Sequence, residues 1–323
     1  MTYAGPDQIN QALSFPSLIE ALRLAFGSGE AVTPLRHHHD FKNPPEDKDS
    51  TLLLMPSWIP GKDLGVKVVT VSPNNAKYQL PAIHGVYLLF DGHTGDCRLV
   101  LDAKTLTTWR TAATSALASS FLSREDSRTL LMVGTGALGP QLIRAHATVR
   151  PIRKVLVWGR SKDKADALTN SLKGPGIEVV AETNLASAIE EADIISCATL
   201  SESPVIHGKY LRSGQHLDMV GAYRPHMREA DDEAIRRSSI FVDHYQGALH
   251  ETGDLAIPLR EGVIKREDIR AELSELCSGL KQGRSNPGEI TFFKSVGHAL
   301  EDLVAARMVA GGMNEEGRTK NEE

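Results

Sequence analysis

Thr129-Leu130-Leu131-Met132-Val133-Gly134-Thr135-Gly136-Ala137-Leu138-Gly139-Pro140 is an apolar, strand-like run followed at once by the pattern Gly-x-Gly-x-x-Gly. Helical spacing then continues to residue 149. In such a loop Gly134 makes a tight turn, Gly136 lets a pyrophosphate approach the backbone, and Gly139 lets the helix pack on the strand. The helix N-terminus adds N–H groups and a partial positive charge. We therefore predict that residues 134–139 bind a dinucleotide, against the alternative of a tight turn without a ligand.

Strands and helices alternate through the sequence that follows this loop. Strands are predicted at residues 129–134, 154–159, 178–181, 193–198, 216–220 and 240–243. Helices are predicted at 162–172, 186–191 and 229–236, in addition to the one that follows the glycine loop. This alternation is typical of a doubly wound, Rossmann-type parallel sheet with helices on both faces.

The two ends of the chain have a different pattern. Residues 7–27 predict an amphipathic helix, with Ser17 as a possible cap and Gly27 or Gly29 as its stop. A polar loop at 37–50 precedes four strand-like runs, and a helix rich in Ala, Ser and Thr follows them; the runs are 52–55, 65–71, 85–90 and 98–101, and the helix is 105–122. The chain closes with a helix at 295–310 and a frayed tail. We expect α/β architecture with two domains.

Composition excludes several classes of protein. The 323 residues are 41% hydrophobic and 24% charged, which is ordinary for a globular chain and not for a disordered one. The formal charge of -5 favours neither nucleic acid nor an anionic membrane as a partner. Apolar runs are far shorter than the ~20 residues that span a bilayer, and the N-terminus lacks the features of a signal peptide. Three separated cysteines predict neither a disulfide framework nor a metal site. We expect a cytoplasmic protein.

The type of dinucleotide is indicated at the end of the second strand of this region. NAD-binding loops place an Asp or Glu there, against the ribose hydroxyls. Here the residues are Val157-Trp158-Gly159-Arg160-Ser161-Lys162, with Lys164 close by and no carboxylate at the tip. Arg160, Ser161 and Lys164 could instead hold a 2′-phosphate, so we predict NADPH, with NADH possible. The alternative is that these charges are only solvated.

Two basic residues lie where apolar ones are expected. Lys67 shares a strand face with Val69 and Val71, so it either protects a sheet edge, which composition favours, or binds an anion. Arg110 projects from a helix face of small and apolar residues, and its partner is either a protein carboxylate or a substrate carboxylate.

Five blocks of sequence together resemble the ornithine cyclodeaminase and mu-crystallin family. They are Gly65-Val66-Lys67, Arg110-Thr111-Ala112-Ala113-Thr114-Ser115-Ala116, the Gly134 loop, Val220-Gly221-Ala222, and Phe293-Lys294-Ser295-Val296-Gly297 with Glu301-Asp302. The resemblance spans essentially the whole chain in order. It implies a substrate and dimerisation domain built from both chain ends (1–122 with 292–323), a Rossmann domain (123–291), and a homodimer.

The resemblance also implies roles for single residues. Arg36, Lys67 and Arg110 match the basic residues that hold a substrate carboxylate in the family. Further cofactor contacts are expected at Thr199, Val220 and Ser295.

One departure from the family separates its chemistries. Where ornithine cyclodeaminases have an Asp that assists deamination, this chain has Tyr223. The resemblance therefore implies an NAD(P)H-dependent reductase of a small cyclic imino acid, Δ1-pyrroline-2-carboxylate giving L-proline or the six-membered Δ1-piperideine-2-carboxylate giving L-pipecolate. The proton donor stays open among His84, Tyr223, Lys67 and water. Ornithine cyclodeamination, an activity like alanine dehydrogenase, and a non-catalytic dinucleotide-binding protein are the alternatives.

Overall fold

The computed structural model describes residues 2–44, 46–172 and 176–319, with side chains up to residue 313. The chain forms two compact units: unit 1 comprises Met1–Arg110 with His298–Glu323, and unit 2 comprises Thr111–Gly297. The first boundary therefore follows Arg110, where the sequence predicted residue 122, and the second precedes His298, where the sequence predicted residue 292. Residues 111–122 belong to unit 2 because Arg150 binds the backbone of their last turn, and 292–297 belong there because they include a central strand of its sheet.

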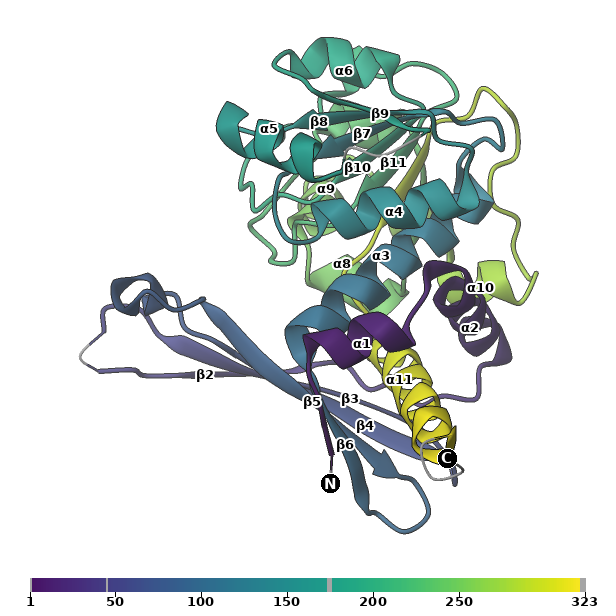
Figure 1. Cartoon of the computed structure of the whole chain (residues 1–323). Helices are drawn as coiled ribbons and strands as arrows, with labels where there is room; N and C mark the ends of the chain where they lie inside the picture. Colours follow the sequence, from purple (N-terminus) through teal and green to yellow (C-terminus); the bar gives the residue numbers. More distant parts are fainter. Residues whose placement is uncertain (1, 45, 173–175, 320–323) are drawn as a thin grey trace. The chain divides into compact units, whose positions relative to one another are not determined.

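Unit 1 contains a six-stranded sheet in the order β1-β6-β5-β4-β3-β2 (Figure 1). β1 runs parallel to β6 and the other neighbours are antiparallel. The strands are β1 Thr2–Ala4, β2 His37–Phe41, β3 Ser50–Ile59, β4 Asp63–Val71, β5 Ile83–Asp91 and β6 Cys97–Asp102. The helices are α1 Pro6–Ala12, α2 Phe15–Ser28, the first part of α3 Ala103–Leu122, and α11 Ala299–Thr319, with the short 3-10 helix η1 Asn75–Tyr78.

The two faces of this sheet have different surroundings. On one face, Met55, Tyr87 and Leu89 are buried, and α11 packs against β3, β4 and β5. On the other face apolar side chains stay accessible: Leu64 is 36% and Val86 is 37% exposed. The register decides which residue joins which face, because residues paired across antiparallel strands point the same way.

Several local predictions for unit 1 were wrong. Residues 7–27 form two helices, and the second begins after Ser14, not Ser17; the Ser14 side chain makes no capping hydrogen bond in the described first turn. The predicted stop at Gly29 is confirmed, and its positive φ of 64° favours glycine. His37, His38 and His39, which begin the predicted polar loop, lie instead in the exposed edge strand β2, because they pair with β3. The last helix begins at Ala299 and continues to Thr319, through residues predicted to fray, while 320–323 lie outside the described residues.

Unit 2 confirms the Rossmann-type fold class. Its eight strands are all parallel, in the order β13-β12-β14-β11-β10-β7-β8-β9 (Figure 1). They are β7 Thr129–Val133, β8 Lys154–Trp158, β9 Glu178–Ala181, β10 Ile194–Cys197, β11 His216–Met219, β12 Ser239–Val242, β13 Ile269–Glu272 and β14 Thr291–Lys294. The sequence analysis missed β13 and β14, which are only four residues long.

Helices and short 3-10 turns connect these strands. They are α4 Gly139–Val149, α5 Lys162–Ser171, α6 Leu185–Glu191, α7 Asp232–Arg236, α8 Tyr245–His250, α9 Gly253–Arg260 and α10 Leu273–Cys277, with η2 Gly208–Tyr210 and η3 Arg266–Asp268. Along the chain, β8 and then β9 are added on one side of β7, and β10 is then added on the other side of β7. Ligands of open parallel sheets bind at such a switch point, outside the carboxyl ends of the strands.

Within the described ranges, no helix has the length and apolar character needed to cross a membrane. The same ranges contain no group of three or more His, Cys, Asp or Glu side chains placed to hold a metal ion.

Candidate active site

Lys67 lies in the middle of the unit 1 sheet, not at its edge. It is on β4 between Met55 of β3 and Tyr87 of β5, so the alternative that it protects a sheet edge is wrong. Its side chain is 4% exposed and its Nζ lies 2.7 Å from Oδ2 of Asp302 on α11. Nζ also lies 3.4 Å from the hydroxyl of Thr107 on α3. The sheet, α3 and α11 therefore converge on one buried ammonium group.

Arg110 reaches the same place from α3. Asp102 begins this helix by accepting hydrogen bonds from the backbone and hydroxyl of Thr105. Arg110 Nη1 donates to Glu301 Oε2 at 2.6 Å, and its Nε donates to Asp302 Oδ1 at 3.2 Å. Both carboxylates are fully buried. Arg110 thus has protein carboxylates as partners, and Asp302 bridges the two cations.

Two cations face two carboxylates in this cluster, and Arg36 adds a further positive charge nearby. Burial and the nearby positive charge of Arg110 lower the pKa of Lys67 to about 8, although Asp302 opposes the shift. Arg36, half-buried before β2, lowers it further. The cations and desolvation together outweigh Asp302, so a carboxylate bound beside Lys67 would stabilise the protonated ammonium. We name this group of Lys67, Arg110, Glu301 and Asp302 the cation cluster.

Two residues of β5, His84 and Tyr87, lie on opposite faces of the unit 1 sheet, and only Tyr87 is on the face of Lys67. His84 pairs with Thr70 across β4 and β5, whereas Lys67 pairs with Tyr87, so His84 lies exposed on the opposite sheet face. The structure therefore does not bring His84 to the cation cluster. Tyr87 is fully buried, and its hydroxyl has no hydrogen-bond partner among the described residues. Its ring covers Gly65, where an added Cβ would lie 1.9 Å from the hydroxyl oxygen.

The glycine loop of unit 2 has the shape its pattern predicts. Gly134 has φ of 120°, and an added Cβ would lie 2.6 Å from the carbonyl oxygen of Ala198, so the loop packs against the end of β10. At Gly139 an added Cβ would lie 3.3 Å from a methyl of Leu168. At Gly136, in contrast, no described heavy atom lies within 4 Å of that position. The space in front of α4 is therefore open where a pyrophosphate would approach.

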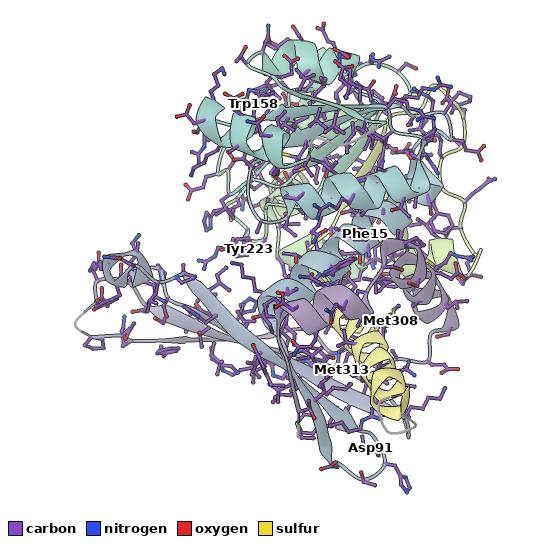
Figure 2. The ribbon with its side chains drawn as sticks, viewed as in Figure 1. Phe15, Asp91, Trp158, Tyr223, Met308 and Met313 are labelled. Carbon is purple, nitrogen blue, oxygen red and sulfur yellow. The ribbon has the colours of Figure 1, made fainter. Side chains whose placement is uncertain are left out.

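The end of β8 carries the residues proposed to choose the cofactor. Trp158 closes this strand (Figure 2), and Arg160, which is exposed, has no ion pair within the described part of the chain. Ser161 caps α5 by accepting from the backbone of Lys164, whose own side chain is exposed. Lys162 pairs with Asp166 at 2.6 Å, which removes it as a free cation.

Three more predicted cofactor residues follow neighbouring strands of the sheet. Thr199 follows β10, Val220 follows β11, and Ser295 follows β14. Their backbones bind across the strand ends, since Val220 donates to the carbonyl of Cys197 and Ser295 to that of Met219. All three therefore lie at the carboxyl ends of adjacent parallel strands.

Tyr223 lies in the loop after β11, half-buried, with the Arg224 guanidinium 5.6 Å from its ring centre (Figure 2). The carboxylates that could replace a missing Asp are engaged elsewhere. Asp231 caps α7 and binds His207, Asp232 pairs with Arg228, and Asp218 is buried against His146 and Ser196.

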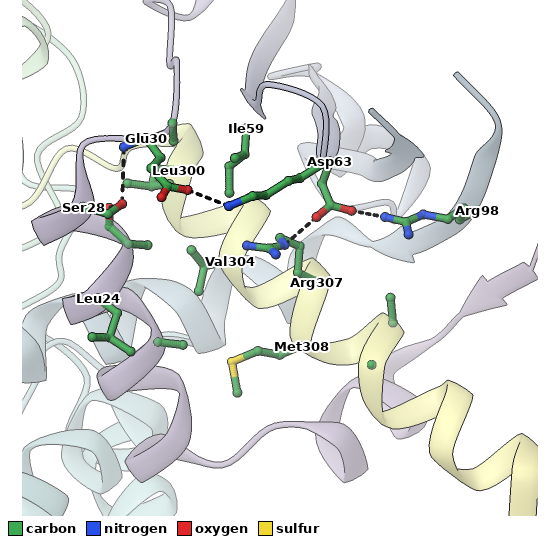
Figure 3. Close-up of a pocket in the computed structure, with 16 residues that line it drawn as sticks. Leu24, Ser28, Glu30, Ile59, Asp63, Arg98, Leu300, Val304, Arg307 and Met308 are labelled. Atoms are coloured by element: carbon green, nitrogen blue, oxygen red, sulfur yellow. Dashed lines mark hydrogen bonds and ion pairs between the residues drawn. The ribbon is translucent and has the colours of Figure 1, made fainter. Parts of the chain in front are cut away.

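A separate cavity of about 610 Å³ lies in unit 1 between α2 and α11 (Figure 3). Leu24, Val304 and Met308 line its apolar side. At its polar end Asp63 is paired with both Arg98 and Arg307, and Lys62 is paired with Glu30 at 2.8 Å. None of the predicted site residues lines this cavity.

Sequence reasoning quoted Glu301 and Asp302 but gave them no role, and it did not single out Thr107 or Tyr87. The carboxylates were detectable in principle, because Glu301 and Asp302 are adjacent to Leu300, Leu303 and Val304, and acids are rarely fully buried without a partner. Tyr87 gives no such signal, since a tyrosine in a strand is ordinary.

The fold and the two sets of residues define a class: a Rossmann-type dinucleotide-binding unit joined to a second α/β unit with a buried cation cluster. The ornithine cyclodeaminase/mu-crystallin family model matches residues 8–317, so the chain belongs to this family. An uncharacterized protein of Schizosaccharomyces pombe is 46% identical over 94% of each chain. A Δ1-pyrroline-2-carboxylate reductase of Colwellia psychrerythraea is 36% identical, over 96% of this chain and 98% of that one.

Solved structures show the same architecture. Thermococcus litoralis Δ1-pyrroline-2-carboxylate reductase, solved in complex with NADH and L-proline, has a TM-score of 0.90, 35% identity and 98% coverage of both chains. An archaeal alanine dehydrogenase dimer with bound NAD also has a TM-score of 0.90, at 26% identity over 98% of this chain and 96% of that one.

Proposed function

We propose that this protein is an NAD(P)H-dependent reductase of a small cyclic imino acid, with Δ1-pyrroline-2-carboxylate as substrate and L-proline as product. The observation that carries the proposal is the buried cation cluster, in which Lys67 and Arg110 meet beside Glu301 and Asp302, with Arg36 as a third positive charge nearby. Relatives and a solved structure of matching architecture carry the name of this activity. The six-membered Δ1-piperideine-2-carboxylate, which would give L-pipecolate, presents the same carboxylate and C=N group.

In this mechanism Arg110 orients the substrate carboxylate, because its planar guanidinium is held in place by Glu301 and Asp302. Lys67 donates a proton to the ring nitrogen; its lowered pKa makes it a better acid than an ordinary lysine. A nicotinamide cofactor, when held by the loop at 134–139, would supply a hydride to the imine carbon, so that C=N would become CH–NH. The open space in front of Gly136 fits its pyrophosphate.

The test compares two chemistries in one purified protein. With NADH or NADPH, the wild type should reduce preformed Δ1-pyrroline-2-carboxylate to proline, measured by loss of absorbance of the reduced cofactor. It should release no ammonia from L-ornithine with NAD, because Tyr223 is a poor substitute for a carboxylate base at neutral pH; a phenol has a reference pKa of ~10. Robust ammonia release, or cofactor binding without turnover of the imine, would overturn the proposal.

We further propose that NADPH is the preferred cofactor. Arg160 is exposed at the tip of β8 and has no ion pair within the described ranges, so its guanidinium is available to a 2′-phosphate. Replacing Arg160 with alanine should raise the Kd of NADPH by roughly 10- to 100-fold, the value of one charged hydrogen bond, and change that of NADH little. Fluorescence titration of both cofactors measures this, and Arg153→Ala, an exposed arginine before β8, is the control. Equal losses for both cofactors would refute it.

The accessible sheet face of unit 1 supports a homodimer. Leu64 and Val86 are more than a third exposed there, and a second copy could bury this apolar surface. We expect light scattering to give twice the mass of one chain. Val86→Asp should produce monomers, while Leu24→Asp on α2, also exposed, should not. A monomeric wild type would contradict the proposal.

A further inference from the structure

Glu229 occupies an unusual place in unit 2. Its side chain is fully buried in the segment that follows the Tyr223 loop, just before α7, and the sequence analysis gave it no role. One carboxylate oxygen, Oε1, accepts from the backbone N–H of Thr199 at 2.7 Å and from the Thr199 hydroxyl at 2.8 Å. The other, Oε2, accepts from the N–H groups of Gly221 at 2.6 Å and Ala222 at 3.2 Å. Each oxygen therefore serves a different loop.

These two loops follow β10 and β11 and lie beside the switch point of the sheet. Thr199 also adjoins Ala198, whose carbonyl packs against Gly134 of the glycine loop. The loops approach each other so closely that a Cβ added to Gly221 would lie 2.0 Å from the carbonyl oxygen of Thr199. Where a dinucleotide is expected to bind, Glu229 therefore hydrogen-bonds to both loops, and Gly221 allows them to approach each other.

A second layer of buried charge holds Glu229 itself. Asp254, at the start of α9, accepts from the backbone N–H groups of Glu229 and Ala230 at 2.8 and 3.2 Å. Its other oxygen pairs with Lys294 Nζ at 3.0 Å, and both side chains are fully buried. Lys294 ends β14 and directly precedes Ser295. The network therefore connects the carboxyl ends of β10, β11 and β14.

We propose that Glu229 is a positioning residue for the nicotinamide cofactor, whose carboxylate fixes the loops after β10 and β11 at the distance that cofactor binding requires. This rests on the proposed function, in which a dinucleotide binds at this edge. A carboxylate suits the task, because both of its oxygens can accept hydrogen bonds, and here they accept four on two sides. Burying its charge costs stability unless every partner is in place, and here both oxygens are fully used.

The amide isostere gives a strict test. Glutamine has the shape of glutamate but only one acceptor oxygen, so in Glu229→Gln an NH2 group must face the donors of one loop. We expect the Kd of NADH and NADPH to rise by on the order of tenfold to a hundredfold. This is the effect expected when the carboxylate loses its charged hydrogen bonds to one of the two loops. At saturating cofactor, the KM for the imine should stay near the wild-type value. A cofactor Kd equal to that of the wild type would overturn the proposal.

A matched control separates positioning from general stability. Glu289 precedes β14 and so lies at the amino ends of the strands, away from the loops after β10 and β11. Its carboxylate accepts a hydrogen bond from Ser285 and pairs with Arg270. Glu289→Gln should lower the melting temperature without changing the cofactor Kd. If both variants lose cofactor affinity equally, Glu229 acts only through stability and the proposal is wrong.

A second variant covers the case in which Glu229→Gln does not fold. Glu229→Asp keeps the charge and both acceptor oxygens, but its shorter side chain cannot reach the donors of both loops. This variant should bind cofactor more weakly than the wild type, and equal binding would refute the role of Glu229. These titrations need no imine. A wild type that binds no cofactor would refute the proposed function, whereas normal binding by the Glu229 variants would refute only this inference.

Discussion

Lys67→Met should lower kcat for imine reduction by roughly 10²- to 10⁴-fold, the usual contribution of a positioned general acid. Methionine keeps much of the length of the side chain but can neither donate a proton nor attract a carboxylate. At low imine concentration the wild-type rate should be high below pH 8 and fall above it, because Lys67 of the substrate-free protein loses its proton near its lowered pKa of about 8. The residual rate of the variant should not show this alkaline decrease. Stopped-flow single-turnover rates between pH 6 and 10 measure both effects.

Folding must be controlled in this experiment. Removing one partner of a buried ion pair costs about 3–5 kcal/mol, and Asp302 would keep only Arg110. Lys67→Arg keeps the positive charge, but a guanidinium does not give up its proton at neutral pH, so this variant should fold and still lose kcat. Lys62→Met, an exposed lysine before the same strand, should retain normal rates. An alkaline decrease that persists in Lys67→Met would assign the proton transfer to another group.

Gly136→Val should raise the Kd of NADH and NADPH by on the order of a hundredfold or more while leaving the melting temperature unchanged. A Cβ at Gly136 meets no described atom within 4 Å, so the protein itself has room for the side chain. The valine would instead fill the space that a pyrophosphate needs, at the cost of several charged hydrogen bonds of ~1.5–3 kcal/mol each. Isothermal titration together with thermal unfolding separates the two effects.

Gly134→Ala should lower the melting temperature, in contrast to Gly136→Val. The φ of 120° at position 134 is unfavourable for alanine, and the added Cβ would lie 2.6 Å from the carbonyl oxygen of Ala198. Gly311→Val, at another open position, should change neither property. If Gly136→Val binds cofactor normally, the loop is a strand-to-helix turn without a ligand.

The sequence alone determined the features that depend on neighbouring residues. An apolar strand, a glycine pattern and the start of a helix lie within twelve consecutive positions around Gly134, so their local chemistry predicts the turn and its open front. The alternation of strands and helices predicts the parallel sheet for the same reason. Lys67 and Arg110 were identified as exceptions to apolar patterns, and the missing acid near Arg160 was visible directly.

Only the tertiary structure decided what those exceptions contact. Arg110 and Asp302 are 192 positions apart and meet because α11 packs on the sheet beside α3. The strand register placed Lys67 on the face under α11 and His84 on the other face, and a shift of one residue would exchange them. Glu229 gave no signal in the sequence, because its four donors come from two loops whose distance is set by the order of the strands. Periodicity reports burial along one element, whereas the partner of a buried charge depends on how separate elements pack.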